Sequence, residues 1–120
     1  MDFSKCIPHS SEYDLKGELL YLLRELEISL LLSFDNFKEL KINSAYRSPE
    51  YEVRQGRSGL SAHCLGKAVD IHCTDNRLRY QILNFAIKKG INRIGIYKTF
   101  IHLDIASCKD GKGQYTIWFD

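Results

Sequence analysis

The stretch Ser61-Ala-His-Cys-Leu-Gly-Lys-Ala-Val-Asp70 combines a polar loop, a glycine and the beginning of a strand. From Lys67 to Cys73 apolar and polar residues alternate, which predicts a strand, because side chains at i and i+2 share one face. Gly66 suits a tight turn just before that strand. The strand should therefore present Asp70 and His72 on the face opposite its apolar side chains.

A second strand of the same kind is predicted from Phe100 to Ile105, with His102 and Asp104 on its polar face. If the two strands are neighbours, His63, Asp70 and His102 supply the three protein ligands of a zinc site that leaves a fourth position for water. Taken singly, each of these residues is better explained as an ordinary polar residue of a half-exposed strand than as a ligand. The combination favours a metal site, because Asp is depleted in strands and here occupies both of them.

Ser61-x-His63-x-x-Gly66-x-Ala68-x-Asp70, followed by His102-x-Asp104, resembles the M15 zinc D,D-peptidases. These belong to a wider group with the D-Ala-D-Ala carboxypeptidases, the lysostaphin-type enzymes and the hedgehog signalling domain. The upstream Ser44-Ala-Tyr-Arg-Ser-Pro49 is similar to the Tyr-Arg-Ser segment of the family, so the resemblance covers roughly half of the chain.

The resemblance implies that Zn²⁺ is the cofactor and that its ligands are His63, Asp70 and His102. It also implies that Arg47 takes part in catalysis by stabilising a developing oxyanion, or binds a substrate carboxylate, and that the substrate is a peptidoglycan stem peptide. The chain would then be a D,D-carboxypeptidase or endopeptidase, and a phage or prophage endolysin is one such enzyme. A catalytically silent zinc module that binds wall peptide or a protein partner is the alternative.

The general base departs from the family pattern. Relatives often carry Glu or Asp three residues before the last zinc histidine, or His two residues before it, and here these positions hold Thr99 and Phe100. Asp104 is the best remaining candidate, because it shares a strand face with His102. Its alternative role is to orient that histidine. His72 is the second candidate.

Arg47 and Ser61 are the candidate substrate-binding residues. Arg47 lies between a strand predicted over Glu39 to Ala45 and a helix capped by Ser48, so its side chain can be aimed into a cleft. Its planar fork matches a carboxylate, although a surface arginine with a local ion pair is the alternative. Ser61, two residues before His63, either contacts substrate or fixes the loop.

The remaining elements form the scaffold. Leucines at helical spacing predict a helix from Leu15 to about Leu32, and a second helix carries Leu78 to Lys89. Two further strands are predicted over 93–97 and 114–119. Trp118 and Phe119 either edge the cleft or cap the core, and one of them is expected in the core. The predicted fold is α+β: one domain, 1–120, with a small, mainly antiparallel sheet, helices packed on one face and the zinc site on the other.

Composition excludes several classes of protein. With 17 basic and 15 acidic residues, the net charge of +2 gives no basic stripe for nucleic acid. The four cysteines lack Cys-x-x-Cys spacing, so a thiolate zinc site is not indicated. Their even number allows two disulfides, but a domain of this size does not need them, and we expect free thiols. No signal peptide and no apolar run of about 20 residues is present. We therefore expect a monomer made in the cytoplasm that acts on the cell wall, either released through a partner or lacking its signal in this chain.

Overall fold

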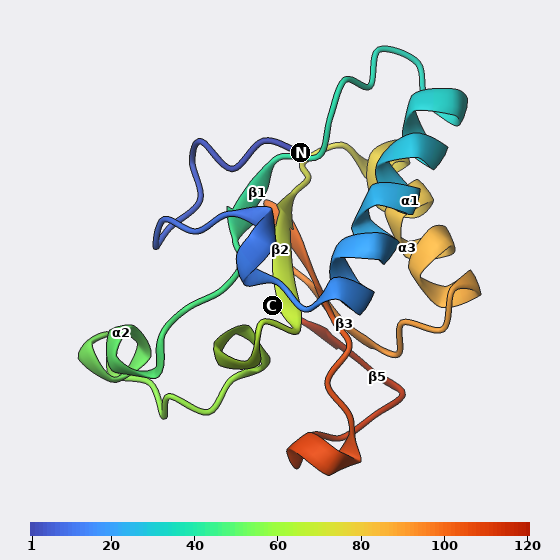
Figure 1. Ribbon diagram of the computed structural model, residues 1–120. Coiled ribbons are helices and arrows are strands. Elements are labelled where there is room, and N and C mark those ends of the chain that lie inside the picture. The colour runs from blue at the N-terminus through green and yellow to red at the C-terminus, as the bar shows by residue number, and fades with distance from the viewer.

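In the computed structural model, which describes residues 1–120, five strands form one sheet in the order β1-β2-β4-β3-β5 (Figure 1). The strands are β1 (Ile42–Ser44), β2 (Ala68–His72), β3 (Arg93–Ile96), β4 (Phe100–Asp104) and β5 (Thr116–Phe119). All neighbours pair antiparallel except β3 and β5, which are parallel. The predicted α+β class with a mainly antiparallel sheet is confirmed.

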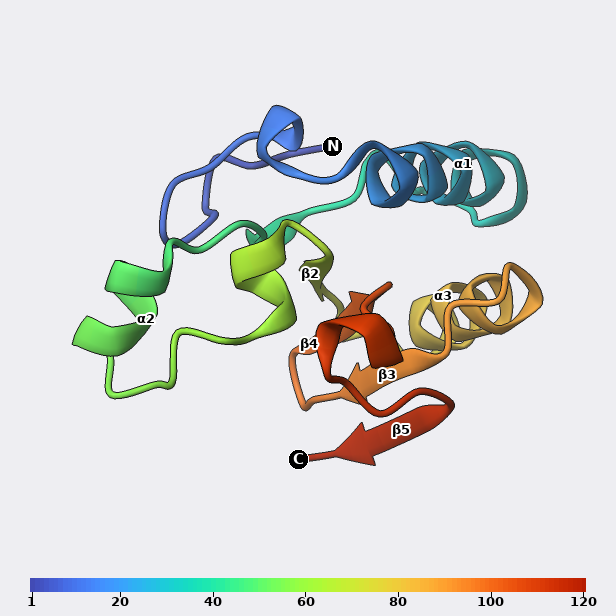
Figure 2. The same ribbon diagram turned by 60° about the horizontal axis from the view of Figure 1, so that its bottom comes forward.

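Two long helices cover one face of this sheet. The helices α1 (Gly17–Ser33) and α3 (Asn76–Lys88) lie side by side over the strands, whereas the short helix α2 (Pro49–Arg54) lies on the opposite side (Figure 2). The leucines predicted at helical spacing explain the position of α1, because those facing the sheet are fully buried: Leu19, Leu23, Leu26 and Leu30. No helix is long and apolar enough to cross a membrane.

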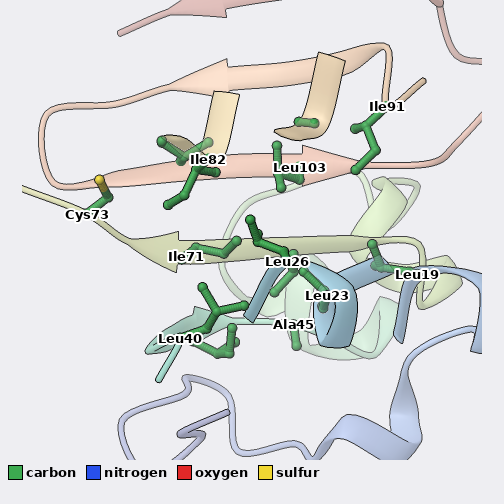
Figure 3. Close-up of a cluster of buried hydrophobic side chains, with 14 of the residues drawn as sticks. Leu19, Leu23, Leu26, Leu40, Ala45, Ile71, Cys73, Ile82, Ile91 and Leu103 are labelled. Carbon is green, nitrogen blue, oxygen red and sulfur yellow. The ribbon is translucent and has the colours of Figure 1, made fainter. Parts of the chain in front are cut away.

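The core lies between these helices and the sheet (Figure 3). Val69 of β2 lies opposite Leu103 of β4, and Ile71 lies opposite Ile101, and all four side chains are at most 1% exposed. Burying each such side chain contributes about 1.5–3 kcal/mol. Because strand side chains alternate between faces, this burial forces the residues in between to the other face of the sheet.

Two elements begin or end elsewhere than expected. The first strand is only three residues long, because its register with β2 shifts between Ile42 and Ser44. The residue before it, Lys41, also pairs with the N-terminal segment through a parallel bridge to Asp2. The first long helix, predicted from Leu15, begins at Gly17, and a single 3₁₀ turn, Glu12–Asp14, precedes it with Ser11 as its cap.

Candidate metal centre

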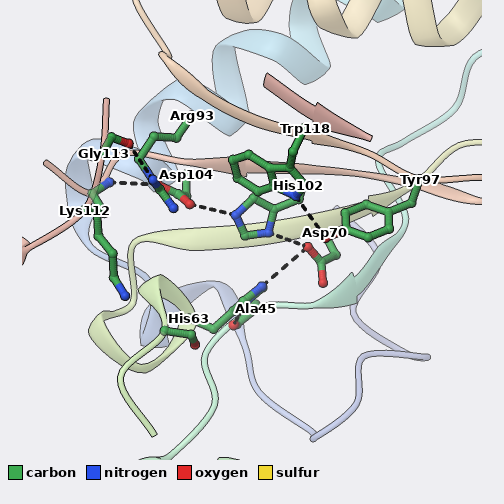
Figure 4. A network of polar contacts seen from close by, with 12 residues as sticks. Ala45, His63, Asp70, Arg93, Tyr97, His102, Asp104, Lys112, Gly113 and Trp118 are labelled. Atoms are coloured by element: carbon green, nitrogen blue, oxygen red, sulfur yellow. Dashed lines mark hydrogen bonds and ion pairs between the residues drawn. The ribbon is translucent and has the colours of Figure 1, made fainter. Parts of the chain in front are cut away.

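Three elements bring one candidate ligand each to the face of the sheet that is opposite the core (Figure 4). His63 lies on the 3₁₀ helix η2 (Ala62–Leu65), Asp70 lies on β2, and His102 lies directly opposite Asp70 on β4. Their ligand atoms all lie within 4.8 Å of one another. The structure thus brings together the three residues that the sequence pattern proposed as metal ligands.

His63 is fixed by its backbone surroundings. Its ring is 3% exposed, and its Nδ1 lies 2.6 Å from the carbonyl oxygen of Ala45. Because a carbonyl only accepts, Nδ1 donates, and Nε2 keeps its lone pair for a metal. That Nε2 lies 3.4 Å from Asp70 Oδ1.

Gly66 turns the chain from η2 into β2. It has φ of +69°, and a Cβ at this position would lie 2.9 Å from the carbonyl oxygen of Asp14. Both the left-handed backbone and the close approach require glycine. The tight turn predicted before the strand is confirmed, and it sets the distance between His63 and Asp70.

His102 lies between two carboxylates. Its Nδ1 is 2.9 Å from Asp70 Oδ1, and its Nε2 is 2.7 Å from Asp104 Oδ2. Burial opposes a charge on the ring, but the hydrogen bonds to Asp104 and Asp70 outweigh it and raise the pKa of His102. Burial likewise opposes ionisation of Asp70, yet the hydrogen bond from His102 and the nearby His63 lower the pKa of Asp70. A divalent cation at this point would replace the proton on Nδ1.

Asp104, our candidate general base, is enclosed by its own hydrogen-bond partners. It is fully buried and is not among the residues that line the cavity beside the three ligands. Besides His102 it accepts hydrogen bonds from Arg93 Nε at 2.7 Å and from the backbone N–H of Ala106 at 3.1 Å. Both oxygens are therefore engaged, and this environment favours the alternative role of orienting His102.

The second candidate base, His72, also lies outside the cavity. It shares a strand face with Asp70, but it is exposed at the end of β2, opposite Phe100. The hollows it lines contain Lys41 and none of the candidate ligands. Sharing a strand face with Asp70 therefore does not bring His72 into the site, because its exposed side chain lies over other hollows at the end of β2.

Arg47 is occupied by groups of the protein itself. Its three nitrogens donate to Ser44 Oγ at 3.0 Å, Glu52 Oε2 at 3.0 Å and Asp70 Oδ2 at 3.3 Å, and its side chain is 14% exposed. The arginine therefore neutralises and holds the second oxygen of Asp70. The sequence left two roles open for Arg47, substrate binding and a local ion pair. This geometry favours the local ion pair, which lies within the site.

Glu52 is a site residue that the sequence analysis missed. It is fully buried, and Oε2 accepts from Ser61 Oγ at 2.6 Å as well as from Arg47. Burial alone would raise its pKa, but the hydrogen bonds from Ser61 and Arg47 hold the pKa of Glu52 at about 2. Ser61 thus fixes its loop to α2. The six-residue helix Pro49–Arg54 carries no apolar periodicity that would have signalled a buried carboxylate.

A cavity of about 400 Å³ opens beside the three candidate ligands. One wall is aromatic: the rings of Tyr97 and Phe100 stack at 4.2 Å, and Trp118 Nε1 donates to the Tyr97 hydroxyl at 3.0 Å. The Trp118 ring lies 5.2 Å from that of His102 (Figure 4). Trp118 therefore edges the site, and since Phe119 is 74% exposed, our expectation that one of the two lies in the core was wrong.

Trp118 has this position because Gly95 lies beneath it. A Cβ on Gly95 would lie 2.5 Å from Trp118 Nε1, so only a residue without a side chain permits the contact. A larger hollow of about 530 Å³ is lined by Tyr46 and by the segments 13–16 and 64–67. It contains none of the three candidate ligands, which assigns the chemistry to the smaller cavity.

The donor set fits zinc. Two imidazole nitrogens and one carboxylate oxygen are a usual set for a catalytic zinc site with an open fourth position, and each donor here is oriented by a further hydrogen bond. A cluster of this kind is compatible with a metal-dependent hydrolase.

The sequence profile described as Peptidase M15 matches residues 10–104, well over half of the chain and including all three candidate ligands. The chain therefore belongs to the M15 family of peptidases, whose members are in general zinc-dependent. A search among curated proteins gave no match.

Proposed function

We propose that this M15 peptidase hydrolyses peptide bonds of D-amino acids in peptidoglycan stem peptides or their cross-links. The observation that carries the proposal is the convergence of His63, Asp70 and His102 at the edge of a cavity large enough for a short peptide. The cell-wall substrate rests on the motif resemblance given above.

Zinc held by these three residues would supply Lewis-acid chemistry, because it would polarise a carbonyl and lower the pKa of a water ligand to about 7. The chain's own groups prepare the site for that ion. Asp104 and Arg93 keep the Nε2 proton of His102 in place, so that Nδ1 faces Asp70. Arg47 holds the other oxygen of Asp70 and thereby fixes the direction of the carboxylate.

Two further groups shape the space that a substrate would enter. The indole of Trp118 lies beside the ring of His102, with 5.2 Å between the ring centroids, and forms an apolar wall there. Glu52 stays ionised at neutral pH because its pKa is about 2, so it acts as a fixed anion that anchors Arg47 and the Ser61 loop. A pKa so far below neutrality makes Glu52 a poor general base.

The test is digestion of purified peptidoglycan by the zinc-loaded protein, with and without a chelator, followed by mass spectrometry of the fragments. Chelator-sensitive loss of a terminal D-Ala identifies a carboxypeptidase, and conversion of cross-linked dimers into monomers identifies an endopeptidase. His63→Ala should abolish either reaction, whereas His72→Ala should retain it, because His72 is an exposed histidine outside the cavity.

One result would contradict the proposal: protein shown to hold one zinc that leaves every fragment unchanged. That outcome would favour the catalytically silent module that binds wall peptide or a protein partner.

A further inference from the structure

The cavity contains one cationic side chain that no carboxylate of the protein neutralises. Arg57 lines the cavity and is exposed, and it takes part in none of the ion pairs of the structure. Arg47, the other arginine of the lining, already donates to Glu52 and Asp70. Arg57 is thus the guanidinium in this cavity that is available to bind a free carboxylate of a substrate.

The backbone that carries Arg57 is held in place. Its N–H donates to the carbonyl oxygen of Glu52 at 2.9 Å, which ties it to the end of α2. Gly59, with φ of +78°, packs so closely that a Cβ there would lie 3.2 Å from the carbonyl oxygen of Pro49. Beyond it, Lys112 Nζ donates to the carbonyl oxygen of Leu60 at 2.7 Å. The guanidinium of Arg57 is therefore carried by a backbone segment whose position is fixed.

The charge of the cavity favours an anion. Its lining holds two arginines, Arg47 and Arg57, and two carboxylates, Glu52 and Asp70, so their formal charges cancel. A bound divalent cation would bring the sum to two positive charges. Since Arg47 is paired with both carboxylates, the uncompensated positive charge lies at Arg57 and at the metal.

We propose that Arg57 determines specificity by binding a carboxylate of the peptide substrate, so that this enzyme selects peptides with a free carboxylate close to the bond that is cut. The inference rests on the proposed function and names its substrate class. An arginine suits this task because its fork binds a carboxylate through two parallel hydrogen bonds. Ser58, the next residue, also lines the cavity and adds a hydroxyl donor.

The stem peptide could offer this carboxylate from two sources: the C-terminus of the residue released, or a carboxylate on a side branch. Three synthetic peptides distinguish them: the free acid, the C-terminal amide and the side-branch amide. We expect wild-type kcat/KM to fall about 10- to 100-fold with whichever amide removes the group that Arg57 binds, mainly through KM.

The variants are Arg57→Gln, Arg57→Lys and the matched control Arg54→Gln, an exposed arginine of α2 outside the cavity. Arg57→Gln should hydrolyse acid and amide at similar kcat/KM, and Arg57→Lys should keep part of the preference. Arg54→Gln should behave as the wild type. Equal unfolding temperatures would show that each variant is folded.

A binding measurement separates this inference from the proposed function. The peptide acid and its amides are titrated into the zinc-loaded proteins by calorimetry at a temperature where turnover is slow. Preferential binding of the acid that Arg57→Gln abolishes, without hydrolysis by the wild type, would support Arg57 and contradict the peptidase. Hydrolysis of acid and amides at equal kcat/KM, or a preference that persists in Arg57→Gln, would overturn the role of Arg57 and leave the peptidase intact.

Discussion

Asp104 Oδ2 lies 2.7 Å from Nε2 of His102, and this contact decides which nitrogen of the histidine faces Asp70. The carboxylate can only accept, so Nε2 carries a proton and Nδ1 is the nitrogen left for a metal. Arg93 and the backbone N–H of Ala106 hold the other oxygen of Asp104, so this orientation is built into the sheet.

Replacing Asp104 by Asn tests its orienting role. Asn has one acceptor oxygen, so it cannot accept from His102 on one side and from Arg93 and Ala106 on the other as Asp104 does. We therefore expect zinc affinity to fall about 10- to 100-fold. Competition with a chromophoric chelator measures that affinity. The control is Asp110→Asn, which removes a carboxylate bound to Lys67 outside the site.

An unchanged zinc affinity in Asp104→Asn, together with a loss of hydrolysis, would contradict the orienting role. It would restore Asp104 as the general base that the sequence pattern first indicated.

Gly95→Ala should destabilise the fold and displace Trp118 from the site. The new methyl group would meet the indole of Trp118, since an ideal Cβ lies 2.5 Å from Nε1. Trp118 must then move off Tyr97 and His102, and overpacking of this kind costs about 1–3 kcal/mol. Urea unfolding measures the loss, and tryptophan fluorescence reports the displacement, because the chain has one tryptophan.

The matched control is Gly17→Ala, at the first position of α1, where a Cβ would meet nothing within 4 Å. It should leave the stability and the fluorescence close to those of the wild type. Equal behaviour of the two variants would show that the contact between Gly95 and Trp118 does not constrain the fold.

Glu52 should make stability depend on acid pH. Its pKa is about 2 in the folded protein, against an ordinary 4.5, because the hydrogen bonds from Ser61 and Arg47 outweigh the effect of burial. A depressed pKa stabilises the fold fully above pH 4.5, and this contribution is lost as the pH falls toward 2. The difference corresponds to about 3 kcal/mol.

Urea unfolding of the wild type and Glu52→Gln between neutral and acid pH measures this contribution. The variant should be less stable at pH 7, and the gap should close as the pH falls below 4. Glu50→Gln, an exposed neighbour on α2, should parallel the wild type at every pH. A gap between Glu52→Gln and the wild type that is constant with pH would contradict the assigned pKa.

The alternation of residues in two stretches was sufficient to predict which faces Asp70 and His102 occupy. Val69 and Leu103 point into the core, so their neighbours Asp70 and His102 must point to the opposite face of the sheet. The same alternation therefore determines both the core and the site. Gly66 was likewise predicted from local chemistry, because a left-handed turn is a property of a few residues.

Alternation does not say which strands become neighbours, and this is where sequence-based prediction failed. Arg93 reaches Asp104 because β3 pairs with β4 in that register. Trp118 reaches the site only because β5 joins β3 in parallel, over Gly95. Glu52 is buried by contacts with Arg47 and Ser61 from two other segments. None of these pairings has a local signal.

Zinc should stabilise the folded protein through the proposed ligands. At a free concentration 100 times the dissociation constant, zinc adds about 2.7 kcal/mol to the free energy of unfolding. Thermal unfolding with zinc and with a chelator should therefore differ for the wild type and for His72→Ala. His63→Ala should lose this difference, and a full zinc effect in that variant would place the ion elsewhere.

The central claim is that His63, Asp70 and His102 hold one zinc ion, and anomalous diffraction from zinc-loaded crystals tests it most directly. We predict one strong peak, bounded by His63 Nε2, His102 Nδ1 and a carboxylate oxygen of Asp70, each about 2.0–2.2 Å from the metal. A peak held instead by a cysteine sulfur or by His72, with none at this cluster, would contradict the account.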